Sequence, residues 1–260
     1  MHDVSSFLHA HGITLRKHLG QHFLVNLRIL DAIVQAAKIE PEDHIVEIGA
    51  GIGILTKELL EHARRVTAIE LDRRLIPLLH AYTGNPKLEV IHGDALRTAM
   101  PSEPYKIVAN IPYEITSPLL RHLFLDSQPP ASLTLLIQRE VAEKICEQKR
   151  RGRLAILVQL FGTPHIVRRV SPSAFLPPPK VESAVLHITC FAKPLADPET
   201  LEEVFRLTKL AFGKKRKMLR SSLGKFPGFL ERLKAASLDP ERRPETVSIE
   251  EWITLARTKE

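Results

Sequence analysis

The segment Asn110-Ile111-Pro112-Tyr113 contains the residue types that most directly suggest chemistry. It follows a short apolar run at 107–109, which is typical of a buried strand. At the end of such a strand, an amide oxygen and a backbone carbonyl could accept the two N–H groups of an exocyclic amine, while the tyrosine ring stacks on a planar base. A strand that simply ends in a proline turn explains the same four residues equally well.

A glycine-rich loop and two acidic residues could hold a nucleotide. The loop Gly49-x-Gly51-x-Gly53 follows an apolar run at 44–48, and such a loop lets the backbone approach a nucleotide closely. Glu70 and Asp94 each follow a further apolar run, where Glu70 could accept hydrogen bonds from ribose hydroxyls and Asp94 from an adenine amino group. NAD enzymes and S-adenosylmethionine (SAM) methyltransferases share this pattern. The glycines do not have the G-x-G-x-x-G spacing of NAD enzymes, and Asp94 is a second acidic residue, so the pattern favours the methyltransferases. Taken singly, Glu70 or Asp94 could instead be a solvated acidic residue at the end of a strand.

Alternating strands and helices would position these residues. Apolar patterning predicts a helix after Asn26, one after Gly53, and helices at 72–82, 117–125 (capped by Ser117), 139–147 and 154–161. Strands are expected at 44–48, 65–69, 88–92, 105–109, 133–138, 166–170 and 181–189, with a stiff proline-rich loop at 171–180. This alternation predicts an α/β fold with a doubly wound, Rossmann-like sheet.

Three regions are expected along the chain. The sequence predicts an irregular basic arm at 1–26 and the α/β domain at 27–193. A smaller, all-helical domain is predicted at 194–260, with the boundary at Lys193-Pro194. Between Arg206 and Lys225 there are eight lysines and arginines and no acid, so the helical domain is the more basic one.

Composition restricts the class of protein further. The net charge of +7 and the pI near 9.5 favour a polyanionic partner, although composition alone does not separate nucleic acid from an anionic membrane surface. Two distant cysteines, Cys146 and Cys190, lack metal-ligand spacing and indicate a reducing, cytoplasmic environment without structural zinc. We expect no secretory signal and no membrane span.

In order, the motifs resemble those of the KsgA family, the small-subunit rRNA adenine N6,N6-dimethyltransferases, and more loosely those of the Erm methyltransferases. The resemblance extends from about residue 16 to 223 and rests on segments that are weak singly but specific together: Leu19-Gly20-Gln21-His22-Phe23-Leu24, Val46-Glu47-Ile48-Gly49-Ala50-Gly51, Ile69-Glu70-Leu71-Asp72, Gly93-Asp94-Ala95, Asn110-Ile111-Pro112-Tyr113, Gln138-Arg139-Glu140-Val141 and Phe175-Leu176-Pro177-Pro178-Pro179-Lys180-Val181-Glu182-Ser183-Ala184.

The resemblance implies SAM as the cofactor and no metal. Its binding residues would be His22, Leu24, Gly49, Gly51, Glu70, Asp94 and Asn110. His22 stands where the family often has asparagine, but it can still donate a hydrogen bond to a cofactor carboxylate. Ile111 replaces the commoner leucine without a large change in volume.

Four residues are assigned to the transfer itself. Asn110 and the Pro112 carbonyl would accept the N–H groups of adenine N6, while Tyr113 and Phe175 would stack on the two faces of the base. The alternative roles are structural, with Tyr113 packing on the sheet and Phe175 anchoring its proline loop.

The implied substrate is 16S rRNA within 30S precursor particles, methylated at two adjacent adenosines of a hairpin loop near its 3′ end by a monomeric enzyme. Two basic segments would contact the RNA phosphates, through Arg150, Arg151, Arg153, Lys214, Lys215, Arg216, Lys217 and Arg220. The alternative is that these side chains only face solvent. Three other functions compete: an Erm-type 23S rRNA methyltransferase, a non-catalytic RNA-binding assembly factor on the same fold, and a dehydrogenase.

Overall fold

The computed structural model describes residues 10–12, 21–214, 216–224 and 226–258. Its backbone contacts divide the chain into two compact units, Met1–Ala142 with Pro164–Cys190, and Glu143–Thr163 with Phe191–Glu260. Most of the expected basic arm, including Arg16 and Lys17, lies outside the described residues.

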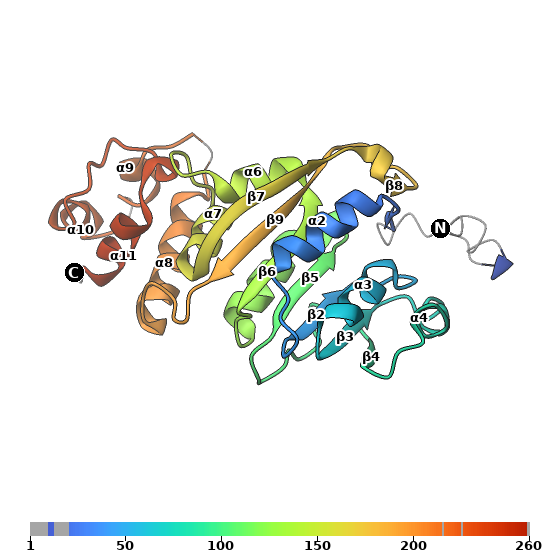
Figure 1. Ribbon diagram of the computed structural model, residues 1–260. Helices are drawn as coiled ribbons and strands as arrows, with labels where there is room; N and C mark the ends of the chain where they lie inside the picture. The colour runs from blue at the N-terminus through green and yellow to red at the C-terminus, as the bar shows by residue number, and fades with distance from the viewer. Residues whose placement is uncertain (1–9, 13–20, 215, 225, 259–260) are drawn as a thin grey trace. The chain divides into compact units, whose positions relative to one another are not determined.

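The first unit is built on a seven-stranded sheet in the order β4-β3-β2-β5-β6-β9-β7 (Figure 1). Neighbouring strands from β4 to β6 run parallel, and β9 pairs antiparallel with β6. The strands are β2 (His44–Ile48), β3 (Arg65–Glu70), β4 (Leu88–His92), β5 (Lys106–Asn110), β6 (Ser132–Gln138), β7 (Gly162–Val170) and β9 (Ser183–Cys190). This sheet confirms the predicted Rossmann-like α/β class.

Helices cover the sheet between successive strands. They are α2 (Leu27–Ala37), α3 (Ile54–His62), α4 (Ile76–Thr83), α5 (Thr116–Arg121), which continues as a π-helical segment at His122–Asp126, and α6 (Arg139–Cys146). Helix α2 begins where the sequence predicts, because the Asn26 side chain accepts hydrogen bonds from the Arg28 and Ile29 N–H groups. Its apolar face packs on β5 and β6, and Ile33 is fully buried there.

Two helix starts differ from the sequence prediction. Helix α4 begins at Ile76 rather than residue 72, because Asp72 caps a separate turn, with its carbonyl accepting the Leu75 N–H. Ser117 does not cap α5. A short 3-10 turn at Tyr113–Ile115 leads directly into the helix at Thr116, and Pro118 occupies the first turn, where its missing N–H costs nothing.

A two-stranded antiparallel sheet was not expected from the sequence. Strand β1 (Phe23–Leu24) lies in the supposed irregular arm, and β8 (Phe175–Leu176) lies in the supposed proline loop. Both strands have only two residues, so neither carries a periodic signal that a sequence pattern could detect. Their pairing ties the segment that precedes α2 to the proline-rich segment.

The second unit is helical in the described residues. It contains α7 (Arg153–Phe161), α8 (Pro198–Ala211), α9 (Leu219–Ser222), α10 (Phe229–Ala235) and α11 (Ile249–Arg257), with Trp252 buried. The sequence assigned 143–163 to the α/β domain, whereas the structure groups these residues with the helical unit, because α7 packs against α8 and α11.

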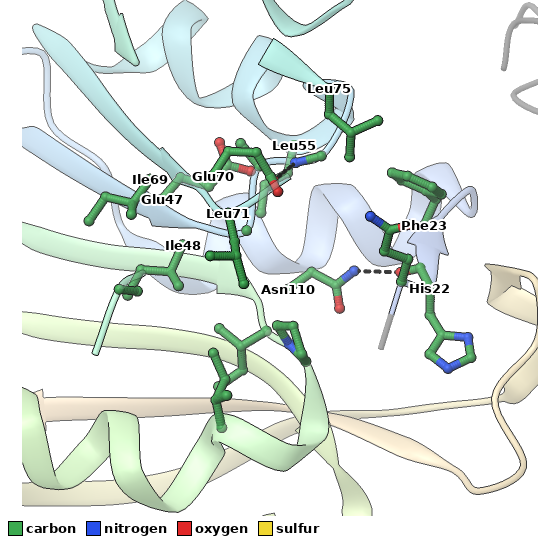
Figure 2. A pocket seen from close by; sticks show the side chains of 18 of the residues that line it. His22, Phe23, Glu47, Ile48, Leu55, Ile69, Glu70, Leu71, Leu75 and Asn110 are labelled. Carbon is green, nitrogen blue, oxygen red and sulfur yellow. Dashed lines mark hydrogen bonds between the residues drawn. The ribbon is translucent and has the colours of Figure 1, made fainter. Parts of the chain in front are cut away.

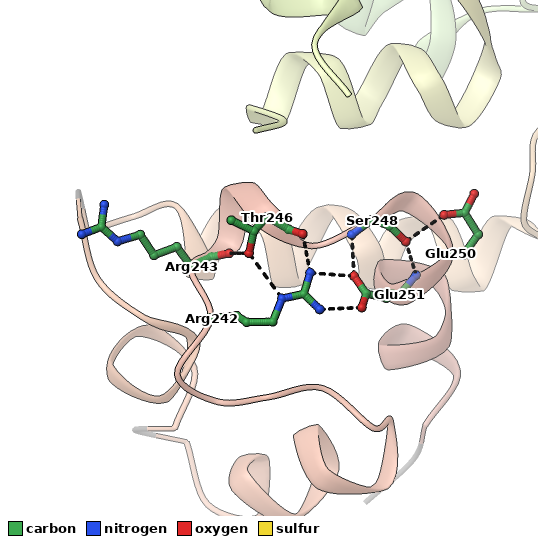
Figure 3. A network of polar contacts seen from close by, with 6 residues as sticks. All are labelled: Arg242, Arg243, Thr246, Ser248, Glu250 and Glu251. Carbon is green, nitrogen blue, oxygen red and sulfur yellow. Dashed lines mark hydrogen bonds and ion pairs between the residues drawn. The ribbon is translucent and has the colours of Figure 1, made fainter. Parts of the chain in front are cut away.

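Polar contacts hold the last helix of this unit. Ser248 and Glu251 form a reciprocal capping box at the start of α11. The Arg242 guanidinium binds both carboxylate oxygens of Glu251 and donates to the Thr246 carbonyl (Figure 3). The turn before α11 is therefore fixed to its first residues.

Candidate functional site

A cavity opens at the carboxyl ends of the parallel strands in the first unit. The strand order reverses between β2 and β5, and in such sheets ligands bind at this point. The segments that follow β2, β3, β4 and β5 line the cavity, together with residues 21–24 (Figure 2). All seven residues expected to bind the cofactor are in the lining: His22, Leu24, Gly49, Gly51, Glu70, Asp94 and Asn110.

The glycine loop leaves β2 with its backbone in the left-handed region. Gly51 has φ of +63°, and a Cβ atom there would lie 2.7 Å from the Phe23 ring. Since a larger residue would meet both strain and a clash, the loop must have glycine at this position. The same peptide donates its N–H to Glu70 Oε2 at 2.7 Å.

Glu70 ends β3 and is almost fully buried in the protein. Its second oxygen, Oε1, accepts the Asp72 N–H at 2.8 Å, so each carboxylate oxygen has one backbone donor and further acceptor capacity. Burial raises the pKa of Glu70, and the two backbone hydrogen bonds counteract that shift. The arrangement presents a fixed pair of acceptors to hydroxyl groups of a ligand.

Asp94 follows β4, lines the cavity and is half-buried. Its Oδ1 accepts the Leu96 N–H at 3.0 Å, which orients the carboxylate. Arg97 lies 4.0 Å from Oδ2 and is largely exposed. Asp94 is thus held in place among the residues that line the cavity.

Glu47 is a cavity residue that the sequence reasoning did not single out. It lies on β2 with 2% of its surface exposed, and its Oε2 has no hydrogen-bond partner among the described residues. Burial, together with the neighbouring Glu70 carboxyl, raises the pKa of Glu47 to about 8. A charged residue inside an otherwise apolar strand was the signal that could have identified it.

Asn110 ends β5 and points into the cavity. Its Nδ2 donates to the His22 carbonyl at 2.9 Å, the contact drawn as a dashed line in Figure 2. No described residue donates to Oδ1, so the amide is oriented by one end and presents its acceptor at the other. This is the orientation that the sequence argument requires for binding an amine.

Pro112 and Tyr113 also line the cavity. The Pro112 carbonyl oxygen accepts the Ile115 N–H at 3.2 Å, and its second lone pair can accept another hydrogen bond. The Tyr113 hydroxyl shares a hydrogen bond of 2.6 Å with Ser183 Oγ, and burial raises the pKa of Tyr113. The tyrosine ring is therefore anchored on β9 at its hydroxyl end, with part of its surface left accessible.

Phe175 does not take the place that the sequence predicted. It is 3% exposed, is absent from the cavity lining and belongs to a hydrophobic cluster with Leu24 and Leu30. Its strand β8 pairs with β1, which turns the phenyl ring into the core. In this structure Phe175 has the alternative role considered above, which is to anchor the proline-rich segment.

The segment before α2 is fixed across the edge of the cavity by three groups that sequence reasoning missed. Gln21 Nε2 donates to Asp72 Oδ2 at 3.1 Å, and Arg74 binds both oxygens of Asp72. Arg74, followed by Gln21, lowers the pKa of Asp72 to about 2. Because Gln21 lies 51 residues from Asp72 in a separate loop, the sequence carries no signal of their contact.

The basic residues belong to the second unit and differ in their surroundings. Arg150, Arg153, Arg216 and Lys217 are exposed, and Arg220 makes an exposed ion pair with Glu241. Arg151 has a structural contact, because its Nε donates to Gln159 Oε1 at 2.7 Å. Lys214 is exposed and also interacts within the chain. Lys215 lies outside the described residues.

The described residues contain no group of three or more His, Cys, Asp or Glu side chains that could hold a metal ion. None of the helices described is long and apolar enough to cross a membrane.

The fold and the cavity define a Rossmann-like methyltransferase. The dimethyladenosine transferase from Plasmodium falciparum is similar over 90% of this chain and 96% of its own, at 31% identity and a TM-score of 0.79. The 23S rRNA methyltransferase ErmE is similar over 91% of this chain and 98% of its own, at 30% identity and a TM-score of 0.75.

Sequence comparisons narrow the class to a family. The family model of ribosomal RNA adenine dimethylases matches residues 12–260. Ribosomal RNA small subunit methyltransferase A of Erythrobacter litoralis is 43% identical, covering 95% of this chain and 91% of the relative. The protein of the same name from Alkaliphilus metalliredigens is 40% identical, covering 93% and 90%. The chain belongs to the ribosomal RNA adenine dimethylase family.

Proposed function

We propose that this protein transfers methyl groups from SAM to N6 of two adjacent adenosines in the 3′-terminal hairpin loop of 16S rRNA, giving N6,N6-dimethyladenosine. It acts as a monomer on 30S precursor particles in the cytoplasm and contributes to subunit biogenesis. The observation that carries the proposal is the oriented Asn110 amide at the tip of β5, which shares one cavity with Glu70 and the glycine loop.

The residues of the cavity fit SAM. Glu70 has acceptor capacity on both oxygens for the ribose hydroxyls, and Asp94 has an oriented oxygen for the adenine amino group. Gly49 and Gly51 have no side chain to keep the backbone from the cofactor, and His22 and Leu24 also line the cavity.

The protein's task is mainly one of orientation. SAM supplies a methyl group on a sulfonium, which is already strongly electrophilic. Adenine N6 is a poor nucleophile because its lone pair is delocalised into the ring, so acceptors that favour a pyramidal nitrogen assist the reaction. Asn110 Oδ1 and the remaining lone pair of the Pro112 carbonyl are those acceptors, since positive charge develops at N6. Holding the reacting groups in line contributes up to ~7–11 kcal/mol for ideally placed groups.

The second transfer places a constraint on the same residues. After one methylation, N6 has a single N–H and needs one acceptor fewer. The Pro112 carbonyl already accepts the Ile115 N–H, so it stays satisfied when the amine no longer donates to it. Asn110 then remains as the acceptor for the half-methylated base.

The basic segments of the second unit support an RNA substrate. The exposed cations at 150, 153, 216 and 217 would contact phosphates, which gives affinity that depends on salt rather than on sequence. Unpaired loop bases cost least to unstack, so a hairpin loop suits a site that needs an extruded base.

The test is incubation with methyl-labelled SAM and particles that lack the modification. We expect label in the RNA of 30S particles and none in that of 50S particles. Asn110→Ala should abolish transfer while the protein stays folded, and Asn85→Ala, in a turn outside the cavity lining, is the matched control. Label in 50S particles would instead assign an Erm-type activity, and calorimetry without detectable SAM binding would indicate a non-catalytic factor.

A further inference from the structure

Ser183 is a fully buried serine at the end of the sheet where the cavity opens. It begins β9, which runs antiparallel to β6, so it lies at the carboxyl end of β6. Asn110, Leu136 and Val185 form one row across β5, β6 and β9. Side chains alternate between the two faces of a strand. Ser183, two residues before Val185, therefore lies on the same face of the sheet as Asn110.

The Ser183 hydroxyl is hydrogen-bonded to Tyr113. Its Oγ lies 2.6 Å from the tyrosine hydroxyl, and the serine end of this contact is fully buried. A buried hydroxyl without a partner is unfavourable, so the serine is stable at this position because the tyrosine satisfies it. Tyr113 itself belongs to a short 3-10 turn at Tyr113–Ile115. The hydrogen bond therefore joins the far end of the tyrosine ring to a strand of the sheet.

This contact fixes the plane of the ring. Two side-chain torsions orient a tyrosine, and a hydrogen bond at the hydroxyl, the atom furthest from the backbone, restrains both. A base that stacks on Tyr113 takes up the plane that the ring presents. Because methyl transfer requires N6 in line with the S–CH₃ bond, the orientation of the ring contributes to that alignment.

The two methyl transfers depend on the ring to different degrees. In the first transfer, adenine N6 has two N–H groups, one for Asn110 and one for the Pro112 carbonyl. In the second transfer a single N–H remains, so the base has one hydrogen bond fewer. Stacking on Tyr113 then provides a larger share of the interactions that hold the base. A ring that is free to turn should slow the second transfer more than the first.

We infer that Ser183 is a positioning residue for the second methyl transfer, which holds the Tyr113 ring in the plane that aligns the half-methylated adenine. The inference rests on the proposed function and adds to it a residue outside the cavity lining. Ser183 acts only through Tyr113, and its hydroxyl determines how completely the enzyme converts the monomethylated base to the dimethylated one.

The hydrogen bond can be removed from either end. The variants are Ser183→Ala, Tyr113→Phe and the two combined. Ser132→Ala is the matched control, because Ser132 is another buried serine of this sheet but begins β6, at the end of the strand away from the cavity. The rate constants of the first and second transfer are measured on unmethylated 30S particles at saturating SAM, by nucleoside analysis over time. The Kd for SAM is measured by calorimetry without RNA.

In Ser183→Ala the second transfer should slow by about 2- to 12-fold, the effect of losing one hydrogen bond. The first transfer should slow less, so N6-monomethyladenosine accumulates. Tyr113→Phe should give the same ratio of products, and the double variant should be no slower than either single variant, since all three lack the same contact. The Kd for SAM should be unchanged throughout, which also shows that the cavity is folded. Ser132→Ala should match the wild type.

Several results would overturn the inference. If the losses multiply in the double variant, Ser183 acts independently of Tyr113. If both transfers slow equally, or if the Kd for SAM rises, the serine has only a general structural role. Should Ser183→Ala fail to fold, Tyr113→Phe decides alone: accumulated N6-monomethyladenosine supports the inference, and a wild-type ratio of products contradicts it.

The same experiment separates this inference from the proposed function. An active wild type that Ser183→Ala matches in both rate constants would remove the inference alone. A wild type that methylates no adenosine in 30S particles would remove the proposed function as well.

Discussion

Charged side chains are buried around the cavity of the first unit but exposed on the surface of the helical unit. Glu47 and Glu70 line the cavity and Asp72 follows the same strand as Glu70; each is less than a tenth exposed, and backbone or side-chain donors hold the last two. In the helical unit, the cations at 216 and 217 are exposed to solvent. Buried, fixed groups recognise a ligand by geometry, while exposed cations attract a polyanion with little demand on position. The two regions should therefore respond differently to substitution, salt and pH.

Arg232 is the exception within the helical unit, and its removal should have the largest effect. It is 8% exposed, binds Glu203 at 2.8 Å and donates to the Leu255 and Ala256 carbonyls at the end of α11. Arg232→Ala should lower the free energy of unfolding by about 2–6 kcal/mol, ~1–3 kcal/mol for each of the Leu255 and Ala256 carbonyls that loses its donor, while Glu203 keeps its pair with Arg206.

Urea denaturation measures this loss. Arg243→Ala is the control, since its ion pair with Glu245 is long and half-exposed and should contribute less than about 1 kcal/mol. Equal losses in both variants would show that burial does not distinguish the two arginines.

In the cavity, the next largest effect is expected for Glu70. Glu70→Gln places an amide N–H₂ against the N–H of Gly51 or Asp72 and removes the charge that strengthens its hydrogen bonds. A hydrogen bond to a charged group contributes about 1.5–3 kcal/mol, so the Kd for SAM should rise by about 10- to 150-fold. Calorimetry checks this, with the exposed Glu61→Gln as the control. A Kd equal to that of the wild type would remove Glu70 from the cofactor site.

Glu47 makes stability depend on pH. Its pKa is about 8 in the folded protein and near 4.5 when exposed, so the folded state binds more protons between these values. The free energy of unfolding should therefore fall as pH rises from about 5 to 8, by up to ~1.4 kcal/mol per pH unit from this residue.

The contribution is isolated by comparison with Glu47→Gln, which cannot ionise. The difference in free energy of unfolding between the wild type and the variant should move in favour of the variant as pH rises. A difference that is independent of pH would show that Glu47 is ionised throughout or is not buried in solution.

The exposed cations should give the smallest and most salt-dependent effect. Arg216→Gln with Lys217→Gln should lower the slope of log K against log salt for RNA binding by about 0.7–0.9 for each phosphate that the variant no longer neutralises. The double variant Lys234→Gln, Arg243→Gln removes the same charge elsewhere in the unit. If it lowers the slope equally, net charge rather than position governs RNA binding.

Sequence patterns predicted the parts of the site that depend on local chemistry. The β2 strand is found at the expected residues, Asn26 caps α2, and Asn110, Glu70 and the glycine loop come together because parallel strands end at one edge of the sheet. The glycine spacing and Asp94 already favoured SAM over NAD, and the resemblance to the family supplied the rRNA substrate.

What the sequence could not predict depends on contacts between distant segments. The pairing of β1 with β8 buries Phe175, and it brings the His22 ring to the Pro177 carbonyl. These segments are 155 residues apart in the chain, and each strand is too short to show a period. The Glu47 carboxyl was missed for another reason: its pKa depends on burial, which only the packed fold determines.

The most direct test of the central claim, that the tip of β5 holds an adenine N6, is the chemical identity of the product. Unmethylated 30S particles would be treated with the wild-type protein and SAM, and the 16S rRNA would be digested for nucleoside analysis by mass spectrometry and mapped by primer extension. We predict N6,N6-dimethyladenosine at two adjacent positions of the 3′-terminal hairpin loop, and none with Asn110→Ala. A methyl group on a ring nitrogen, on a ribose or on another base would contradict the account.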